Sequence, residues 1–176
     1  SLEREGRGAI VDAMGVRGME ARTWLSWEPA LFGPGIRSLD PDLVVLAYGT
    51  NEAADQSYTM DQYRADLRQV LAKLKKSAGQ DVACILAGPS DRGWNFGDGT
   101  FAIWDRTAPV AQVQREVAGE FNCAVWDWQE AMGGPGSMVA WTHRDPALGS
   151  KDLIHHGPAG YVEIAKRFLA AIGALR

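Results

Sequence analysis

The chain has 176 residues, 46% of them hydrophobic, a size typical of one domain with a buried core. Its formal net charge is -4, and it has no run of Lys and Arg dense enough to bind nucleic acid or an anionic membrane, because both partners require a concentrated positive field. No apolar stretch approaches the roughly 20 residues that cross a bilayer, so the sequence predicts no membrane span.

Short apolar runs alternate with amphipathic segments, which predicts a layered α/β domain with a mainly parallel sheet. The expected strands are nearly continuous apolar runs, as in a sheet covered on both faces: Ala9 to Met14, Leu43 to Tyr48, Val82 to Ala87 and Ala124 to Trp128. The expected helices run over about Glu20 to Phe32, from a capping box at Thr59 to Gly79, from a cap at Thr107 to Phe121, and along the last amphipathic stretch from Tyr161 to Ile172.

Two cysteines, Cys84 and Cys123, lie in or beside expected strands. A pair of buried, reduced thiols is the simpler interpretation, and a disulfide between them is the alternative. The first residues lack the apolar core and the cleavage site of a signal peptide, which carries no information about location if the chain begins within a longer protein.

Loops that follow the strands are where an open α/β sheet binds its ligands. Two of them, Gly88 to Thr107 and Gln129 to Lys151, are longer than most loops that do not shape a site. The segment Gly133 to Ser137 resembles a phosphate-binding loop but lacks its Lys, so we interpret it as the rim of a pocket. Trp94 is the candidate ligand contact, because indole rings stack on sugar faces.

Asp152 and His155 stand three residues apart in the loop that precedes the last helix. A carboxylate can orient an imidazole, and the imidazole can then take a proton from a serine hydroxyl. The structural alternative is a helix cap beside a solvated histidine. A zinc site with His156 and His143 is a further alternative, which we disfavour because adjacent histidines seldom point the same way, and we predict no metal.

Two motifs together resemble the SGNH (GDSL-like) hydrolases: Gly49-Thr50-Asn51-Glu52 after an apolar strand, and Asp152-Leu153-Ile154-His155 before the last helix. The resemblance covers nearly the whole chain and extends to bacterial peptidoglycan O-acetylesterase-like members. It implies a three-layer α/β/α fold with a flavodoxin-like sheet of order 2-1-3-4-5, and a serine esterase that needs no cofactor. By this resemblance Asp152 and His155 are catalytic, and Gly18 and Asn51 form the oxyanion hole. Glu52 stands where the family more often has Asp, and we interpret it as a structural residue that fixes the turn, with no chemical role.

The first block of the family, Gly-Asp-Ser on the first strand, does not occur in the sequence. In the implied strand order the serine-bearing strand lies between the first two expected strands, so without it the apolar edges of both are open. We therefore expect residues 1 to 176 to be the second part of a discontinuous hydrolase domain whose serine-bearing segment precedes Ser1. Ser90 and Ser137 are alternative nucleophiles, although neither stands at a strand-to-helix elbow.

The leading hypothesis is an esterase that hydrolyses small acyl esters, in particular O-acetyl groups on a bacterial cell-surface carbohydrate. The resemblance implies a periplasmic or extracellular location. A non-catalytic carbohydrate-binding or scaffold protein with the same fold is an alternative from another class, and an O-acyltransferase is a second. A Gly-Asp-Ser motif after an apolar strand upstream of Ser1 would favour an enzyme over the binding protein.

Overall fold

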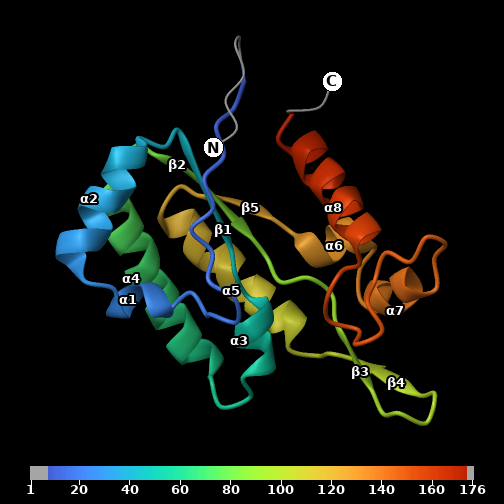
Figure 1. The fold of residues 1–176 in the computed structure, drawn as a ribbon. Helices are drawn as coiled ribbons and strands as arrows, with labels where there is room; N and C mark the ends of the chain where they lie inside the picture. The colour runs from blue at the N-terminus through green and yellow to red at the C-terminus, as the bar shows by residue number, and fades with distance from the viewer. Residues whose placement is uncertain (1–7, 174–176) are drawn as a thin grey trace.

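A parallel sheet of three strands forms the centre of the fold, in the order β1-β2-β5. In this computed structural model, which describes residues 8–173, the strands span Leu43–Ala47 (β1), Ala83–Ala87 (β2) and Ala124–Trp126 (β5). β1 and β2 are paired along their whole length, and helices flank the sheet (Figure 1). The predicted α/β fold with a parallel sheet is confirmed.

Helices fill most of the chain between the strands. Their bounds are Thr23–Ser26 (α1), Pro29–Leu39 (α2), Thr50–Ala54 (α3), Met60–Ala78 (α4), Thr107–Glu120 (α5), Trp128–Met132 (α6), Ser137–Thr142 (α7) and Pro158–Ala171 (α8). An antiparallel hairpin of β3 (Gly93–Asn95) and β4 (Phe101–Ile103) projects from the rest of the fold beyond the end of β2 (Figure 1). The two long loops of the sequence therefore contain this hairpin and the helices α6 and α7.

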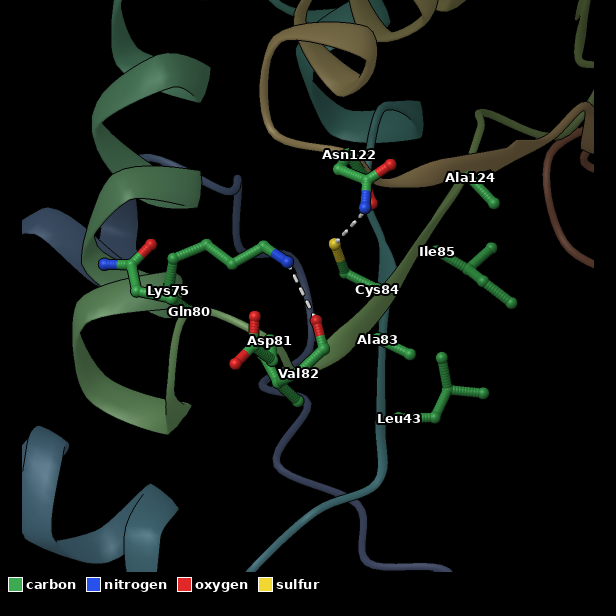
Figure 2. A pocket seen from close by; sticks show the side chains of 10 residues that line it. All are labelled: Leu43, Lys75, Gln80, Asp81, Val82, Ala83, Cys84, Ile85, Asn122 and Ala124. Carbon is green, nitrogen blue, oxygen red and sulfur yellow. Dashed lines mark hydrogen bonds between the residues drawn. The ribbon is translucent and has the colours of Figure 1, made fainter.

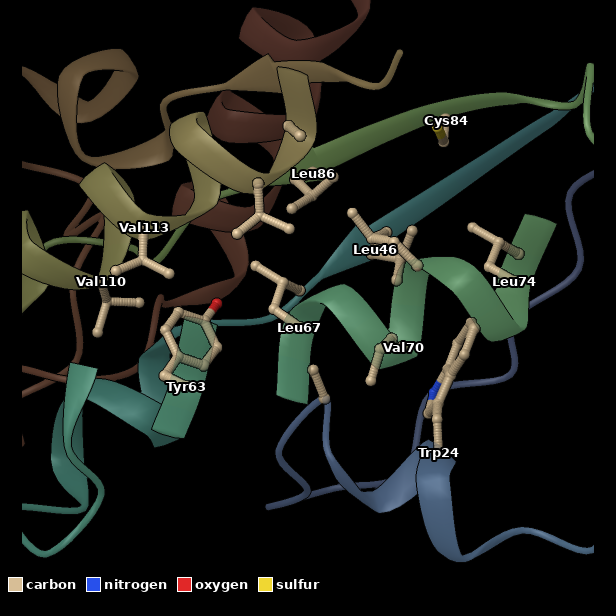
Figure 3. Packing of buried hydrophobic residues seen from close by; sticks show 14 of the residues in the cluster. Trp24, Leu46, Tyr63, Leu67, Val70, Leu74, Cys84, Leu86, Val110 and Val113 are labelled. Carbon is tan, nitrogen blue, oxygen red and sulfur yellow. The ribbon is translucent and has the colours of Figure 1, made fainter. Parts of the chain in front are cut away.

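The main hydrophobic core lies between one face of the sheet and the helices α2, α4 and α5. Figure 3 shows its side chains from the sheet, α4 and α5. Its buried side chains include Leu46 of β1, Leu86 of β2, Leu67, Val70, Leu71 and Leu74 of α4, and Val110, Val113 and Val117 of α5. The apolar stripe of α4 follows from its 3.6-residue period. As the sequence predicted, a capping box at Thr59 and Gln62 starts α4, and Gly79 ends it.

A second cluster of buried side chains joins α6, α7 and α8 at the other side of the sheet. Trp126 at the end of β5 meets Phe168 of α8 edge to face, with 5.0 Å between the ring centroids. Because Trp126 belongs to the last strand of the sheet, α8 covers this face beside β5. It leaves the part of the same face beside β1 exposed, with 39% of Leu43 and 41% of Val45 accessible.

Two predictions about helices are wrong. The expected helix from Glu20 to Phe32 is broken into α1 and α2, because Pro29 cannot continue a helix and instead opens α2, with the Glu28 carboxylate accepting from Ala30 N–H. Thr107 is the first helical residue of α5, not its cap, and its buried hydroxyl has no hydrogen-bond partner among the described residues.

The predicted strand from Ala9 to Met14 is also wrong, since this segment forms no strand and is exposed, with 65% of Ile10 and 80% of Val11 accessible. An apolar run becomes a strand only where a neighbour completes its hydrogen bonds. Within residues 8–173, β1 pairs with β2 on one side and with no strand on the other. The edge of β1 that faces away from β2 is therefore open.

The cysteines form a disulfide, so the prediction of two reduced thiols is wrong and the alternative is correct. The parallel register pairs Ile85 with Ala124, and the residues just before these two are Cys84 and Cys123. Their Cα atoms are 4.8 Å apart, within the range that a disulfide requires. The bond ties β2 to the start of β5.

Candidate active site

The site lies where the carboxyl ends of β1 and β2 meet the loop before α8. β1 leads through Gly49 into α3, which carries Asn51 in its first turn. The chain after β2 contacts both neighbouring segments, since the Arg92 Nη1 donates to Thr50 O (3.5 Å) and Gly93 N–H donates to Leu153 O (2.8 Å). This end of the sheet is where open parallel sheets bind their ligands.

Asp152 and His155 are in direct contact, with 2.7 Å between the carboxylate Oδ2 and the imidazole Nδ1. The other carboxylate oxygen, Oδ1, accepts hydrogen bonds from the backbone N–H groups of Ile154 and His155, each at 2.9 Å. Leu153 between them is buried and adopts a left-handed backbone conformation with φ of 59°. The backbone of the loop thus binds one oxygen of the carboxylate, and the other oxygen orients the imidazole.

The electrostatics of this pair favour an ionised Asp152 that orients the His155 imidazole. Burial acts to raise the pKa of Asp152, but the hydrogen bonds from the His155 backbone, the His155 imidazole and the Ile154 backbone outweigh it and hold the pKa below its ordinary value. With Nδ1 donating to this anion, the Nε2 of His155 keeps its lone pair free to accept a proton. The side chains are open to solvent, 64% exposed for His155 and 45% for Asp152.

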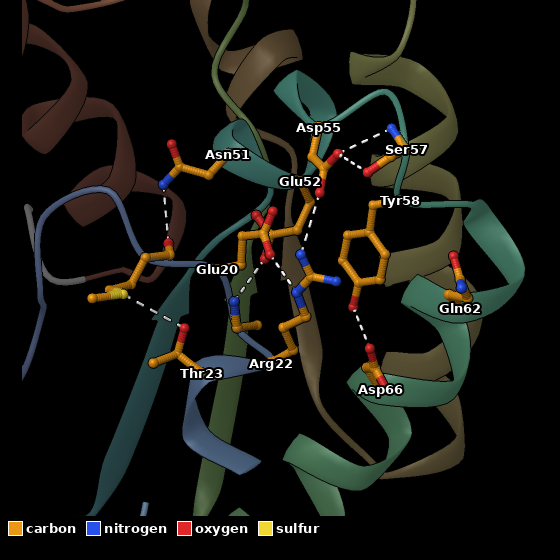
Figure 4. Close-up of polar contacts among 12 residues, drawn as sticks. Glu20, Arg22, Thr23, Asn51, Glu52, Asp55, Ser57, Tyr58, Gln62 and Asp66 are labelled. Carbon is orange, nitrogen blue, oxygen red and sulfur yellow. Dashed lines mark hydrogen bonds and ion pairs between the residues drawn. The ribbon is translucent and has the colours of Figure 1, made fainter. Parts of the chain in front are cut away.

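One hydrogen bond links Asn51, labelled in Figure 4, to the residue that follows Gly18. The Asn51 side-chain Nδ2 donates to the carbonyl of Met19, the neighbour of Gly18, at 2.9 Å. Gly18 has a φ of 72°, a left-handed conformation that glycine adopts without strain. The Asn51 side chain and the glycine turn are therefore linked through Met19.

Glu52 is one of two polar residues near the site whose contacts the sequence did not reveal. Its carboxylate is buried, with 1% of the residue accessible, and accepts from Ala21 N–H and from Gly49 N–H, both at 2.8 Å. Burial raises its pKa, although these backbone donors act in the opposite direction. Only the folded chain brings Ala21 to a residue 31 positions away.

Arg92 is the other such residue. It is 7% exposed, and its guanidinium lies 4.7 Å from the ring centroid of Trp104, in cation–π geometry. Burial lowers its pKa, an effect that the nearby Asp152 carboxylate opposes, and the buried Nε has no partner among the described residues. An Arg in the loop directly after an expected strand was the available signal in the sequence.

Trp94 lies on the exposed hairpin. Half of its surface is accessible, and its ring stacks on that of Trp104, with the centroids 5.8 Å apart and the planes at 26°. Since Trp104 also contacts Arg92, the hairpin joins the site through this stack.

The two alternative nucleophiles are both buried. The hydroxyl of Ser90 lies 3.4 Å from that of Thr50, and the hydroxyl of Ser137 has no partner among the described residues. Neither hydroxyl contacts His155. The glycine-rich segment Gly133 to Ser137 does line a hollow of about 320 Å³, together with Arg144, but neither Asp152 nor His155 lines it.

A larger hollow of about 410 Å³ opens at the amino ends of the strands (Figure 2). Leu43 and Ile85 line it, and Lys75 spans one side by donating to Val82 O at 2.8 Å. Parallel sheets bind ligands at their carboxyl ends, so this hollow lies at the wrong end of the sheet for the site.

Residues 8–173 contain neither a metal site nor a membrane-spanning helix. No three His, Cys, Asp or Glu side chains there gather in a group that could hold a metal ion. No helix in the same range is both long enough and apolar enough to cross a bilayer.

Comparison with known proteins places this geometry in a family. The model of the GDSL-like lipase/acylhydrolase family matches residues 1–162, so the chain belongs to that family. Its fold is that of this family. Among curated proteins, none matches the sequence.

Solved structures of esterases share the fold. A peptidoglycan O-acetylesterase is 26% identical with a TM-score of 0.82, and the match covers 92% of this chain and 45% of that protein. An acetylxylan esterase from Geobacillus stearothermophilus, solved as a catalytic mutant, is 25% identical with a TM-score of 0.62, with 89% of this chain and 68% of that one covered. A lipase/acylhydrolase from Enterococcus faecalis, 22% identical, has the same fold with a TM-score of 0.60, with 90% of this chain and 73% of that one covered. The chain thus spans less than half of the first of these proteins.

Proposed function

We propose that the protein is a serine esterase that hydrolyses small acyl esters, O-acetyl esters in particular. The observation that carries the proposal is the contact between Asp152 and His155 in the loop before α8. In this mechanism His155 Nε2 removes the proton of a serine hydroxyl as it attacks the ester, and later gives a proton to the leaving alcohol. Asp152 orients the imidazole and stabilises its charged form.

The developing negative charge on the ester oxygen requires donors that are already in place. We assign this role to the backbone N–H of Gly18 and the side-chain amide of Asn51. The contact from Asn51 to Met19 O uses one of the two amide hydrogens, which leaves the second for the oxyanion.

We assign the nucleophilic serine to a strand that pairs with the open edge of β1. Three features support this assignment: the unpaired edge, the exposed Leu43 and Val45 beside it, and the exposure of Asp152 and His155. A strand on that edge would end near Asn51, because the carboxyl ends of parallel strands lie at one edge of a sheet. The serine-bearing segment would then cover the exposed side chains of the site.

For the substrate we propose an acetylated carbohydrate of the bacterial cell surface. The peptidoglycan O-acetylesterase and the acetylxylan esterase named above both act on acetylated polysaccharides according to their names, and both are at least 25% identical to this chain. The half-exposed ring of Trp94 offers a flat apolar surface for a sugar ring. No cofactor enters the mechanism.

The proposed location is the periplasm or the exterior of the cell. The disulfide between Cys84 and Cys123 supports it, because disulfides persist in oxidising compartments and are rare in the cytosol. An enzyme in the periplasm or outside the cell could also reach a substrate at the cell surface.

The test is kinetic and uses the intact protein that carries the serine-bearing segment, with a chromogenic phenyl acetate as substrate. His155→Ala should remove most of the turnover, by roughly 10³-fold or more, because no other base is in place. Asp152→Asn should lower kcat less, because the backbone contacts at Oδ1 can survive the change. His143→Ala, which removes the exposed histidine that follows α7, is the matched control and should have the wild-type rate.

The outcomes separate the proposal from its alternatives. Wild-type rates in His155→Ala would overturn the mechanism. An intact protein that binds acetylated glycan without any turnover would instead be a carbohydrate-binding protein. Acetyl transfer to an added sugar in preference to water would identify an acyltransferase.

A further inference from the structure

Two consecutive side chains of α3 hold the same short segment of backbone (Figure 4). Asn51 donates from its amide to Met19 O, and Glu52 accepts at Oε1 from Ala21 N–H, 2.8 Å away. One side chain thus binds a carbonyl of the segment and the other binds an N–H group two residues later. Because the segment is bound at both a carbonyl and an N–H group, its distance from α3 and its direction relative to α3 are both fixed.

The second oxygen of Glu52 connects this segment to the end of β1. Oε2 accepts from Gly49 N–H at 2.8 Å, so each carboxylate oxygen has its own backbone donor. Gly49 is a position that only glycine fits: its φ is 125°, and a Cβ placed there would lie 2.8 Å from Pro89 Cδ. Glu52 therefore links the backbone of Ala21 to the turn at the end of β1.

Burying a carboxylate is costly, so the two hydrogen bonds that compensate for this cost are important for the stability of the loop. Only 1% of Glu52 is accessible, and a buried anion is tolerated when its oxygens are fully hydrogen-bonded. The loop that it binds is otherwise open, since Gly18 and the residues before it are exposed. The other charged contacts of this loop are made by Arg22, whose side chain pairs with Glu20 and Asp55.

We propose that Glu52 is the positioning residue of the oxyanion hole. It touches no reacting atom. It acts through backbone groups, by setting the distance from the Gly18 turn to the Asn51 amide, which are the two donors assigned above. This inference rests on the proposed function for its kinetic consequence, but the geometry that it requires can be tested without turnover.

The test compares two variants in the intact protein. Glu52→Gln replaces one acceptor oxygen by an NH₂ donor, so one of the two N–H groups must lose its partner. Glu52→Asp keeps the charge but is one methylene shorter, so it cannot reach both donors. A misplaced oxyanion donor costs about 10²-fold in rate, so both variants should lower kcat on an acetyl ester by roughly 10- to 100-fold while KM changes little. Glu116→Gln, the same change on the outer surface of α5, should leave both constants unaltered.

A second measurement does not depend on activity. In the ¹H–¹⁵N NMR spectrum, Glu52→Gln and Glu52→Asp should shift the backbone amide of Gly18 and the side-chain amide of Asn51, whereas Glu116→Gln should not. If one variant fails to fold, as judged by circular dichroism, the other decides. If both fail, hydrogen exchange in the wild type decides: the Ala21 and Gly49 amides should be protected, and free exchange at Ala21 would end the proposal.

Folded variants with wild-type kcat and an unshifted Gly18 amide would overturn the inference. An intact wild-type protein without esterase activity would instead contradict the proposed function, and the NMR comparison would still test the geometry. A loss confined to KM would assign Glu52 to substrate binding and would also contradict the positioning role.

Discussion

His156, the neighbour of the proposed base, has the opposite environment from His155. It is 7% exposed and packs among three aromatic rings, those of Trp128, Trp141 and Tyr161, at centroid distances of 5.6, 5.4 and 5.3 Å. Its buried Nε2 has no partner among the described residues. Burial lowers its pKa, and the nearby His155 lowers it further. The fold therefore favours the neutral form of His156.

This predicts a specific loss of stability in weak acid. The unfolded chain binds a proton at His156 below the ordinary pKa of 6.5, whereas the native state resists it, so the contribution of His156 is complete above pH 6.5 and falls as the pH drops through the lowered folded pKa. His156→Phe keeps an aromatic ring without a titrating group. The thermal midpoint of this variant should change less between pH 7 and pH 5 than that of the wild type.

The matched control is His143→Ala, at an exposed position, which should retain the wild-type pH dependence. The Asp152 carboxylate is also stabilising, but its pKa lies below an ordinary value of 3.8, so its contribution is lost only at lower pH. An equal loss between pH 7 and pH 5 in His156→Phe would show that another group is responsible.

At the residue scale, the sequence predicted those contacts whose two residues are close together in the chain. Asp152 and His155 are three positions apart, so their contact follows from local geometry. The roles assigned to them by resemblance remain predictions. The long-range contacts of Glu52 and Arg92 were not predicted, because Ala21 and Thr50 are 31 and 42 positions away and only tertiary packing brings them near.

At the element scale, the disulfide joins two strands that also pair by hydrogen bonds. It links Cys84 and Cys123, which are 39 positions apart, so it restricts a long loop in the unfolded chain. Replacing both by alanine should therefore lower the free energy of unfolding by roughly 2–4 kcal/mol.

Urea unfolding with and without a reducing agent measures this effect. The reduced wild type should match the double alanine variant, and the reducing agent should not change the variant. A wild type whose unfolding midpoint is insensitive to reduction would show that the bond contributes nothing to stability.

The elements that the sequence predicted well are those specified by local signals. The capping box at Thr59 and the glycine at Gly79 bound α4 as expected, because caps act within one helical turn. The segment from Ala9 to Met14 has the apolar composition of a strand, but a strand also needs a partner, which no local pattern supplies. The disulfide depended on a register between strands, which the sequence left open.

At the scale of the whole molecule, the open edge of β1 is the dominant feature. Its backbone groups pair with β2 on one side only among the described residues, and apolar side chains are exposed beside it. Unpaired central strands expose hydrogen-bonding groups that other chains can complete, which promotes aggregation.

We therefore expect residues 1 to 176, expressed alone, to be poorly soluble and inactive. Supplying the upstream serine-bearing segment, fused or co-expressed, should restore solubility and activity together, since one strand would complete the sheet and bring the nucleophile beside His155. Sedimentation of the expressed chain and hydrolysis of a phenyl acetate measure the two properties. A soluble 176-residue chain with cooperative unfolding and esterase activity would contradict the assignment of the serine, and Ser90 and Ser137 would then be the residues to mutate.

The two oxygens of Asp152 have a consequence for how such a site can evolve. Oδ1 holds the backbone of the loop and Oδ2 holds the imidazole, so one residue serves both the shape of the loop and its chemistry. Loss of the reaction would therefore leave the loop's need for an oxygen at this position unchanged. An intact Asp-x-x-His motif in a relative therefore indicates that the loop has this shape. Whether that relative is active has to be judged from its serine.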